Sequence, residues 1–134
     1  MEIKRNDATR SRPDGSRIID APYVFMDIPA FTEQLKNEKS WDKNHRNGIT
    51  VFKSDEITMV VTALKTGSEI CNHTENVFFT LLVLQGEIAI VTADVERDVI
   101  KGQAVAFHPH ILHSIRALSD STLLLTSYCR NVSL

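Results

Sequence analysis

Residues 67–86 read GSEICNHTENVFFTLLVLQG, and residues 102–113 read GQAVAFHPHILH. Each stretch begins at a glycine, which suits a turn that needs a positive φ, and each continues into residues typical of β-strands. Side chains two residues apart on a strand point to the same face of a sheet. The first stretch therefore predicts that Cys71, His73 and Glu75 line one surface.

The sequence on both sides of these stretches has the same β-rich character from about residue 48 onward. Turn residues such as Ser54-Asp55 and Ser119-Asp120 separate short runs, and no helical period intervenes. We expect strands over residues 49–52, 57–64, 77–84, 88–92, 95–100, 104–107, 111–117 and 122–128. Such a series predicts an antiparallel sandwich or barrel.

The two stretches resemble the paired motifs of the cupin superfamily. In the first motif a glycine is followed by His-x-His, a glutamate and a closing glycine; in the second, a glycine, a strand, a bend and a further histidine follow in order. The resemblance covers roughly residues 48–130. It implies an all-β fold, a double-stranded β-helix (cupin) barrel, which we expect here with an N-terminal arm and one short helix. It also implies a small single-domain protein that forms homodimers.

The resemblance implies a set of metal ligands that this sequence keeps only in part. His73 stands at the first ligand position, and His113 stands at the histidine of the second motif. Glu75 occupies the place of the second histidine, and Phe79 occupies the place of the family's glutamate. Ala117 stands where an asparagine is often found. One expected nitrogen ligand is therefore replaced by an oxygen ligand, and one ligand is lost, because a phenyl ring coordinates nothing.

We expect His73 and His113 to project into one barrel cavity and to approach each other. With Glu75 they form a set of two imidazoles and one carboxylate, which suits a divalent metal such as Fe, Zn, Mn or Ni. The alternative is an interior of neutral histidines and a hydrogen-bonded Glu75 that holds water or an organic ligand. In either case the predicted ligand-binding cavity comprises Cys71, His73, Glu75, Phe79 and His113.

Two further histidines lie close to His113 in the sequence. His108 and His110 flank a proline, and we expect one of them, but not both, to border the mouth of the cavity. Together with His73 and His113 they could instead form a rearranged, all-imidazole site.

The remaining candidates are two thiols and one histidine. Cys71 could serve as a metal ligand or as a nucleophile, but no partner arrangement supports catalysis, so we expect it to line the cavity. Cys129 lies in an apolar strand and is predicted to belong to the core. His45 lies in a polar stretch and is predicted to be solvated.

The run over residues 77–84 bears on assembly. If the side chains at positions 79, 81 and 83 point inward, those of Phe78, Leu82 and Leu84 point outward and must be covered. An N-terminal helix carrying Phe31 and Leu35 could cover them, or a second subunit could. The resemblance favours the second subunit, so we expect a homodimer.

The N-terminal third of the chain is organised differently. Residues 1–17 are polar and charged and predict a flexible or loosely docked arm. Residues 18–47 form an extension in which one short helix begins at Asp27-Ile28-Pro29, because proline suits a first helical turn. Residues 42–48 are predicted to be a loop, and the barrel domain occupies residues 48–134.

Composition excludes several classes of function. The chain has 134 residues and a net charge of −2, so it has the length of one domain and no basic excess for nucleic-acid binding. No apolar run approaches the ~18 residues of a membrane-spanning helix, and residues 1–17 lack the apolar core of a secretory signal. We therefore expect a cytoplasmic protein with reduced thiols and no membrane partner.

Three functions remain open on the sequence alone. The first is a small-molecule-binding barrel, with or without a divalent metal on His73, Glu75 and His113. The second is an enzyme, a metal-dependent dioxygenase or isomerase of the cupin type. The third is a structural or regulatory dimer whose cavity is vestigial.

Overall fold

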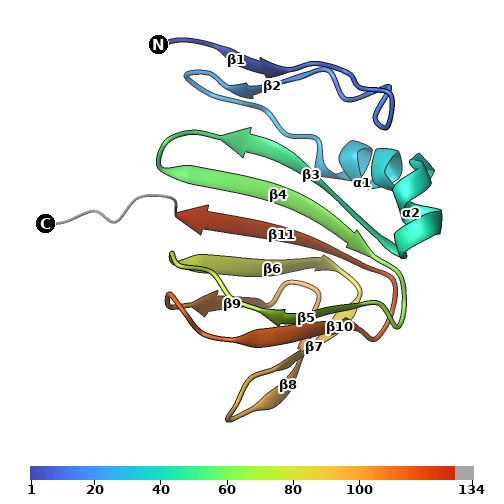
Figure 1. The fold of residues 1–134 in the computed structure, drawn as a ribbon, viewed down its shortest axis with the longest axis vertical. Coiled ribbons are helices and arrows are strands. Elements are labelled where there is room, and N and C mark those ends of the chain that lie inside the picture. Colours follow the sequence, from blue (N-terminus) through green and yellow to red (C-terminus); the bar gives the residue numbers. More distant parts are fainter. Residues whose placement is uncertain (129–134) are drawn as a thin grey trace, which may run out of the picture.

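The computed structural model describes residues 1–128, which form two facing β-sheets and an N-terminal layer (Figure 1). One sheet has five strands, in the order β3 (Arg46–Lys53), β4 (Ile57–Leu64), β11 (Ser121–Tyr128), β6 (Phe79–Gln85) and β9 (Ala104–Phe107). The other has four, in the order β5 (Glu69–His73), β10 (His113–Ala117), β7 (Glu87–Val91) and β8 (Glu96–Ile100). Every pairing in both sheets is antiparallel.

The chain passes from one sheet to the other between β4 and β5, β5 and β6, β6 and β7, β8 and β9, β9 and β10, and β10 and β11. This order is a jelly roll, so the predicted double-stranded β-helix barrel is confirmed. Alternate side chains of both sheets fill the space between them. The buried residues of this central core are Leu64, Phe79, Leu81, Val83, Ile88, Ile90, Val99, Phe107, Ile115, Ala117 and Leu123.

The turn at Gly86 shows why a glycine closes the first motif. Its φ of 83° lies in the left-handed region. A Cβ at this position would also overlap the carbonyl oxygen of Asp120 and the hydroxyl of Ser121. No other residue type fits this turn without displacing the start of β11.

The N-terminal layer contains two helices, where the sequence predicted one. The first, α1 (Ile28–Asn37), begins as expected: Asp27 caps it by accepting a hydrogen bond from the Ala30 amide at 3.1 Å, and a proline lies in its first turn. The second, α2 (Lys39–Asn44), was not predicted, and residues 42–44 belong to it rather than to a loop. The extended backbone of Glu38 separates the two helices, and His45, in the left-handed region, ends the second.

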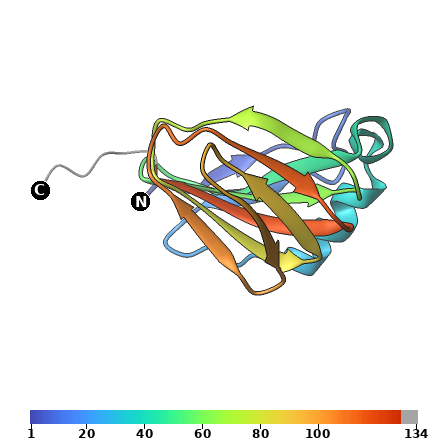
Figure 2. The same cartoon turned by 90° about the horizontal axis from the view of Figure 1, so that it is seen from below.

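The helices cover one part of the five-stranded sheet. Both lie on the right-hand side in Figures 1 and 2, and β11 points away from them. Leu35 of α1 and Trp41 of α2 are buried, and they pack against β3 and β4. Neither helix of residues 1–128 is long and apolar enough to cross a bilayer.

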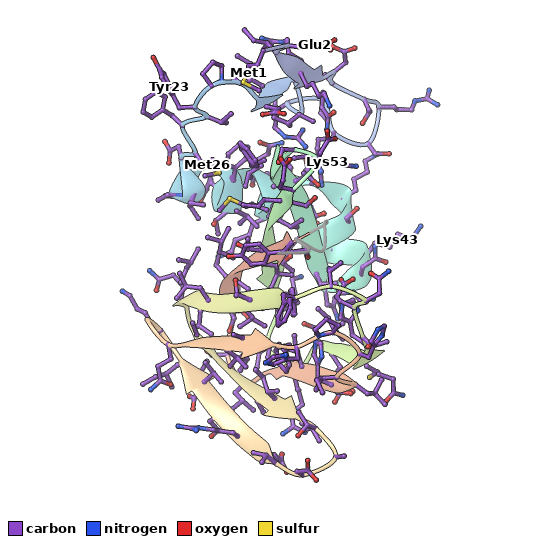
Figure 3. All side chains as sticks on the ribbon, turned by 90° about the vertical axis from the view of Figure 1, so that its left-hand side faces the viewer. Met1, Glu2, Tyr23, Met26, Lys43 and Lys53 are labelled. Atoms are coloured by element: carbon purple, nitrogen blue, oxygen red, sulfur yellow. The ribbon has the colours of Figure 1, made fainter. Side chains whose placement is uncertain are left out.

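The first residues of the chain pair as a hairpin of β1 (Lys4–Asn6) and β2 (Arg17–Asp20). Figure 3 shows the N-terminal residues Met1 and Glu2 above the helix layer. The loop between the strands is fastened at Arg12, whose Nε lies 3.0 Å from Oε1 of Glu38. The structure therefore docks the segment that the sequence identified as a flexible or loosely docked arm, and the domain limits at residues 17 and 47 stay predictions.

Glu38 is the centre of a buried polar network. Its carboxylate is only 7% exposed and accepts hydrogen bonds from Arg12, from Nδ2 of Asn47 at 2.9 Å and from Nε2 of Gln34 at 3.2 Å. These groups come from the arm, from α1 and from β3, so one carboxylate joins three parts of the chain. Charge-assisted bonds of this kind are stronger than neutral ones when they are shielded from water.

We predict that Glu38→Ala lowers the free energy of unfolding by about 2 kcal/mol, because it removes the acceptor of a buried Asn47 N–H and of Nε of Arg12. Urea denaturation measures this. Asp42→Ala is the matched control, because the 85% exposed carboxylate of Asp42 lies 3.6 Å from Lys65 and a surface pair of this kind contributes little. Equal losses in the two variants would contradict the prediction.

The buried cluster beneath the helices, which contains Leu35 and Trp41, includes no residue of β6. Leu124 of β11 packs against that cluster. Leu82 of β6 pairs with Leu124 and therefore lies on the same outer face, and Ala104 of β9 pairs with Leu82 on its other side. Phe78, just before β6, is 46% exposed. The predicted alternation along β6 is confirmed, and the cover of its outer face stays a prediction.

We expect this face to be buried in a homodimer, since apolar side chains that the chain itself does not cover mark interaction surfaces. Light scattering after gel filtration should give twice the mass of one chain. Leu82→Arg should halve that mass, because it places a charge in the middle of the face. A wild-type chain that is monomeric at micromolar concentrations would rule the dimer out.

Candidate functional site

A bulge in β5 determines how His73 points. His73 pairs with His113, but Ile70 pairs with Ile115, so three steps along β5 match two along β10. The extra residue lies at Cys71–Asn72, where Asn72 adopts a φ of 49° and its amide donates to Oγ of Ser114 at 2.9 Å. Because of the bulge, Ile70 and His73 both face the barrel interior although they lie three residues apart.

The same bulge turns Cys71 outward. Its side chain is exposed, and its Sγ lies 3.3 Å from Oε2 of Glu69. That hydrogen bond and the nearby carboxylate charge raise the pKa of the Cys71 thiol, which makes it a poorer nucleophile. The prediction that Cys71 lines the cavity is wrong, because strict alternation fails where a strand carries an extra residue.

Four aromatic rings meet at the end of the barrel where β5 ends and β10 begins. His113 lies 4.3 Å from Phe107 and 5.8 Å from Phe79, nearly parallel to both rings, measured between centroids. His73 stands edge-on to His113 at 5.2 Å. The structure therefore brings His73, His113 and Phe79 together, as the sequence predicted. Phe107 was not predicted; its signal is that it ends an inward-facing strand directly before the histidine-rich bend.

The protonation state of His113 follows from its surroundings. Nδ1 lies 3.0 Å from the carbonyl oxygen of Ile111, which can only accept, so Nδ1 carries the proton. Burial lowers the pKa of His113, and the neighbouring His73 lowers it further, against the raising effect of the Ile111 bond and of Glu75. His113 is therefore a neutral imidazole with a lone pair on Nε2.

That lone pair has no partner. His113 is 2% exposed, and its Nε2 is buried without a hydrogen bond among the described residues. Buried polar atoms of folded proteins are nearly always paired with protein or with ordered water. The atom thus points to something that the protein residues themselves do not supply.

His73 and Glu75 form the more exposed side of the site. Nε2 of His73 lies 3.1 Å from Oε1 of Glu75, and the two side chains are 37% and 35% exposed. Glu75 lies in the loop after β5, and its carbonyl oxygen accepts from the amide of His110 at 2.7 Å. The loop over residues 74–78 is therefore joined to the loop over residues 108–112.

The remaining histidines lie outside the ring cluster. His108 is exposed and packs against Phe78 with the two centroids 4.8 Å apart. His110 is also exposed, with a φ of 67°. His45 is exposed at the end of α2, and Cys129 lies outside the described residues.

The donor atoms do not fit a metal centre. Within residues 1–128, no group of three His, Cys, Asp or Glu side chains is placed to hold a metal ion. The position that would supply a carboxylate is Phe79, whose ring instead packs against His113. Oε1 of Glu75 is already hydrogen-bonded to His73. The site is thus a floor of aromatic rings that carries acceptor groups rather than a set of converging ligands.

Comparison with known proteins supports the fold and leaves the chemistry open. No protein-family model matches the sequence, and no curated protein matches it. A conserved protein of unknown function from Streptococcus pyogenes has a similar structure, with a TM-score of 0.65 and 20% identity over 85% of this chain and 93% of that chain.

Two solved cupins are also similar. A cupin superfamily protein from Desulfitobacterium hafniense has a TM-score of 0.62 and 18% identity over 65% of this chain and 80% of its own. An RmlC-like cupin from Desulfovibrio desulfuricans has a TM-score of 0.61 and 24% identity over 66% and 87%. The chain has the cupin fold, and at these identities the likeness extends no further than the fold.

We predict that His113 makes the protein less stable in acid. Because burial lowers its pKa, the unfolded chain takes up a proton first as the pH falls below the ordinary imidazole value of about 6.5. The stability that depends on neutral His113 is therefore present above that pH and is lost below it. Urea denaturation between pH 7.5 and pH 5 should show a smaller loss for His113→Phe than for wild type. His45→Ala should keep the wild-type loss, and identical pH dependence in all three would contradict the prediction.

Proposed function

We propose that this chain is a small-molecule-binding protein that holds its ligand at the His73–His113 end of the barrel without a metal ion. The observation that carries the proposal is the unpartnered Nε2 of His113, an acceptor buried inside the barrel. A buried acceptor without a donor costs about 1–3 kcal/mol. A bound molecule with a donor group would remove that cost.

The surroundings of the site favour an organic molecule over a lone water. The floor consists of the Phe79 and Phe107 rings, and the loops beside it expose Phe78, Ile111 and Leu112 by 44% or more. Ligand sites typically combine such apolar walls with a few polar groups. Because Nε2 of His113 has no access to solvent, binding requires the two loops to separate. The backbone hydrogen bond from His110 to Glu75 and the packing of His108 on Phe78 hold these loops together.

The enzyme and vestigial-barrel alternatives are outcomes of the same experiment. A metal-dependent dioxygenase or isomerase needs at least three converging ligands, and the described residues provide no such group. A vestigial barrel needs no ligand at all and would satisfy Nε2 with a trapped water.

The test is to purify the protein without chelators, measure its metal content and identify small molecules released on denaturation. We expect well under one metal ion per chain and an organic molecule that disappears in His73→Ala, while His45→Ala retains it. A crystal structure at high resolution should place that molecule against Nε2 of His113. Stoichiometric metal lost in His73→Ala would favour the enzyme, and a single ordered water on Nε2 with no released molecule would favour the vestigial barrel.

A further inference from the structure

Resting on the proposed function, we infer that the ligand of this site is a neutral or cationic molecule with an apolar body that presents N–H groups, and not a carboxylate or phosphate. The chemical classes that fit are amidines, amines and N–H heterocycles. The inference follows from the hydrogen-bonding polarity of the site, from its charge and from its walls.

The inner polar group of the site can only accept. The carbonyl oxygen of Ile111 holds the proton of His113 on Nδ1, which leaves a lone pair on Nε2. Nε2 is buried beside the rings of Phe79 and Phe107. A carboxylate or phosphate oxygen at this position would place lone pair against lone pair, whereas an N–H would complete a hydrogen bond.

The outer polar groups have the same polarity. Glu75 accepts through Oε1, so Nε2 of His73 is the donor of that 3.1 Å bond. This arrangement leaves the second carboxylate oxygen of Glu75 as an acceptor. Glu75 and Nε2 of His113 therefore both offer acceptors to a ligand.

The charge of the site agrees with its polarity. The titratable groups that act on His113 are His73 and Glu75, and the residues recorded against the two imidazoles in the described part of the chain include no lysine or arginine. Protein sites for carboxylates and phosphates rely on guanidinium, ammonium or backbone N–H donors. A carboxylate on one side of the site and no fixed cation favour a positive or neutral ligand.

The aromatic and apolar side chains around the acceptors indicate the character of the ligand's body. Three rings surround the inner acceptor, and aromatic faces attract cations as well as flat apolar groups. The loops at the barrel end add the exposed side chains of Phe78, Ile111 and Leu112. A ligand with its N–H groups directed inward and its apolar body against these loops would use every part of the site.

The test compares benzamidine with benzoate, which have nearly the same shape and opposite hydrogen-bonding polarity. The wild-type protein is titrated with each, and the imidazole and amide resonances of His73 and His113 are followed by NMR in the presence of a chelator. We expect benzamidine to shift both histidines with an affinity at least tenfold higher than that of benzoate. His113→Phe, which keeps a flat ring without an acceptor, should abolish the shift of the His73 resonances.

Two carboxylate variants separate charge in the site from charge on the surface. Glu75→Gln should weaken benzamidine at least tenfold. Glu69→Gln should leave the affinity unchanged, because Glu69 lies on the outer side of β5 beside Cys71. Thermal melting curves establish that each variant is folded.

The outcomes distinguish this inference from the proposed function. Benzoate bound at His113 as tightly as benzamidine would overturn the inference and leave the proposed function standing. Failure of both probes to shift either histidine would also overturn the inference, and the proposed function would then depend on the release experiment alone. If zinc without chelator shifted both imidazoles at one equivalent, the acceptors would serve a metal, and the inference and the metal-free function would both be wrong.

Discussion

The pairing of β5 with β10 is the constraint on which the site depends. It sets His73 opposite His113, and it does so through the extra residue at Cys71–Asn72. Without that residue, Ile70 and His73 would point to opposite faces, and either the core or the site would be lost. The hydrogen bond from the Asn72 amide to Oγ of Ser114 stabilises the bulge, so the position of His73 depends on a hydroxyl of the neighbouring strand.

The second constraint is the exchange of a carboxylate for Phe79. A charged group at this position would lie against His113 and Phe107 in the barrel core, where it would need a cation to offset the loss of hydration. The phenyl ring removes that requirement and stacks with both neighbours. The result is a neutral imidazole in an aromatic environment, so the interior of the barrel remains apolar around two histidines.

Much of the fold could be predicted from local pattern. Strands with clear alternation, such as residues 79–85, and the helix that begins at Asp27 and Pro29 lie where the sequence placed them. The convergence of His73 with His113 followed from the paired motifs. The helix α2 could not be predicted in this way, because its sequence is polar and it is stabilised by burial of Trp41 against the sheet.

The two errors within the site have different physical origins. Alternation assigns side chains to faces only while each residue of a strand has one partner. A bulge adds a residue without a recognisable change in the hydrophobic pattern of the sequence. Cys71 was therefore placed on the wrong side, although Asn72, a residue type that tolerates a positive φ, was a possible sign. Phe107 was missed for a different reason, since a phenylalanine at the end of a strand is ordinary core in sequence terms and only the structure shows its ring against His113.

The outward turn of Cys71 has a practical consequence for spectroscopy. Its thiol is exposed on the opposite side of the strand that carries His73, two residues away. A fluorophore or spin label attached there would report on movement of β5 without entering the barrel. Because the pKa of this thiol is raised, labelling would proceed best in mildly alkaline buffer, and replacing Cys129 with serine would confine the label to this one position.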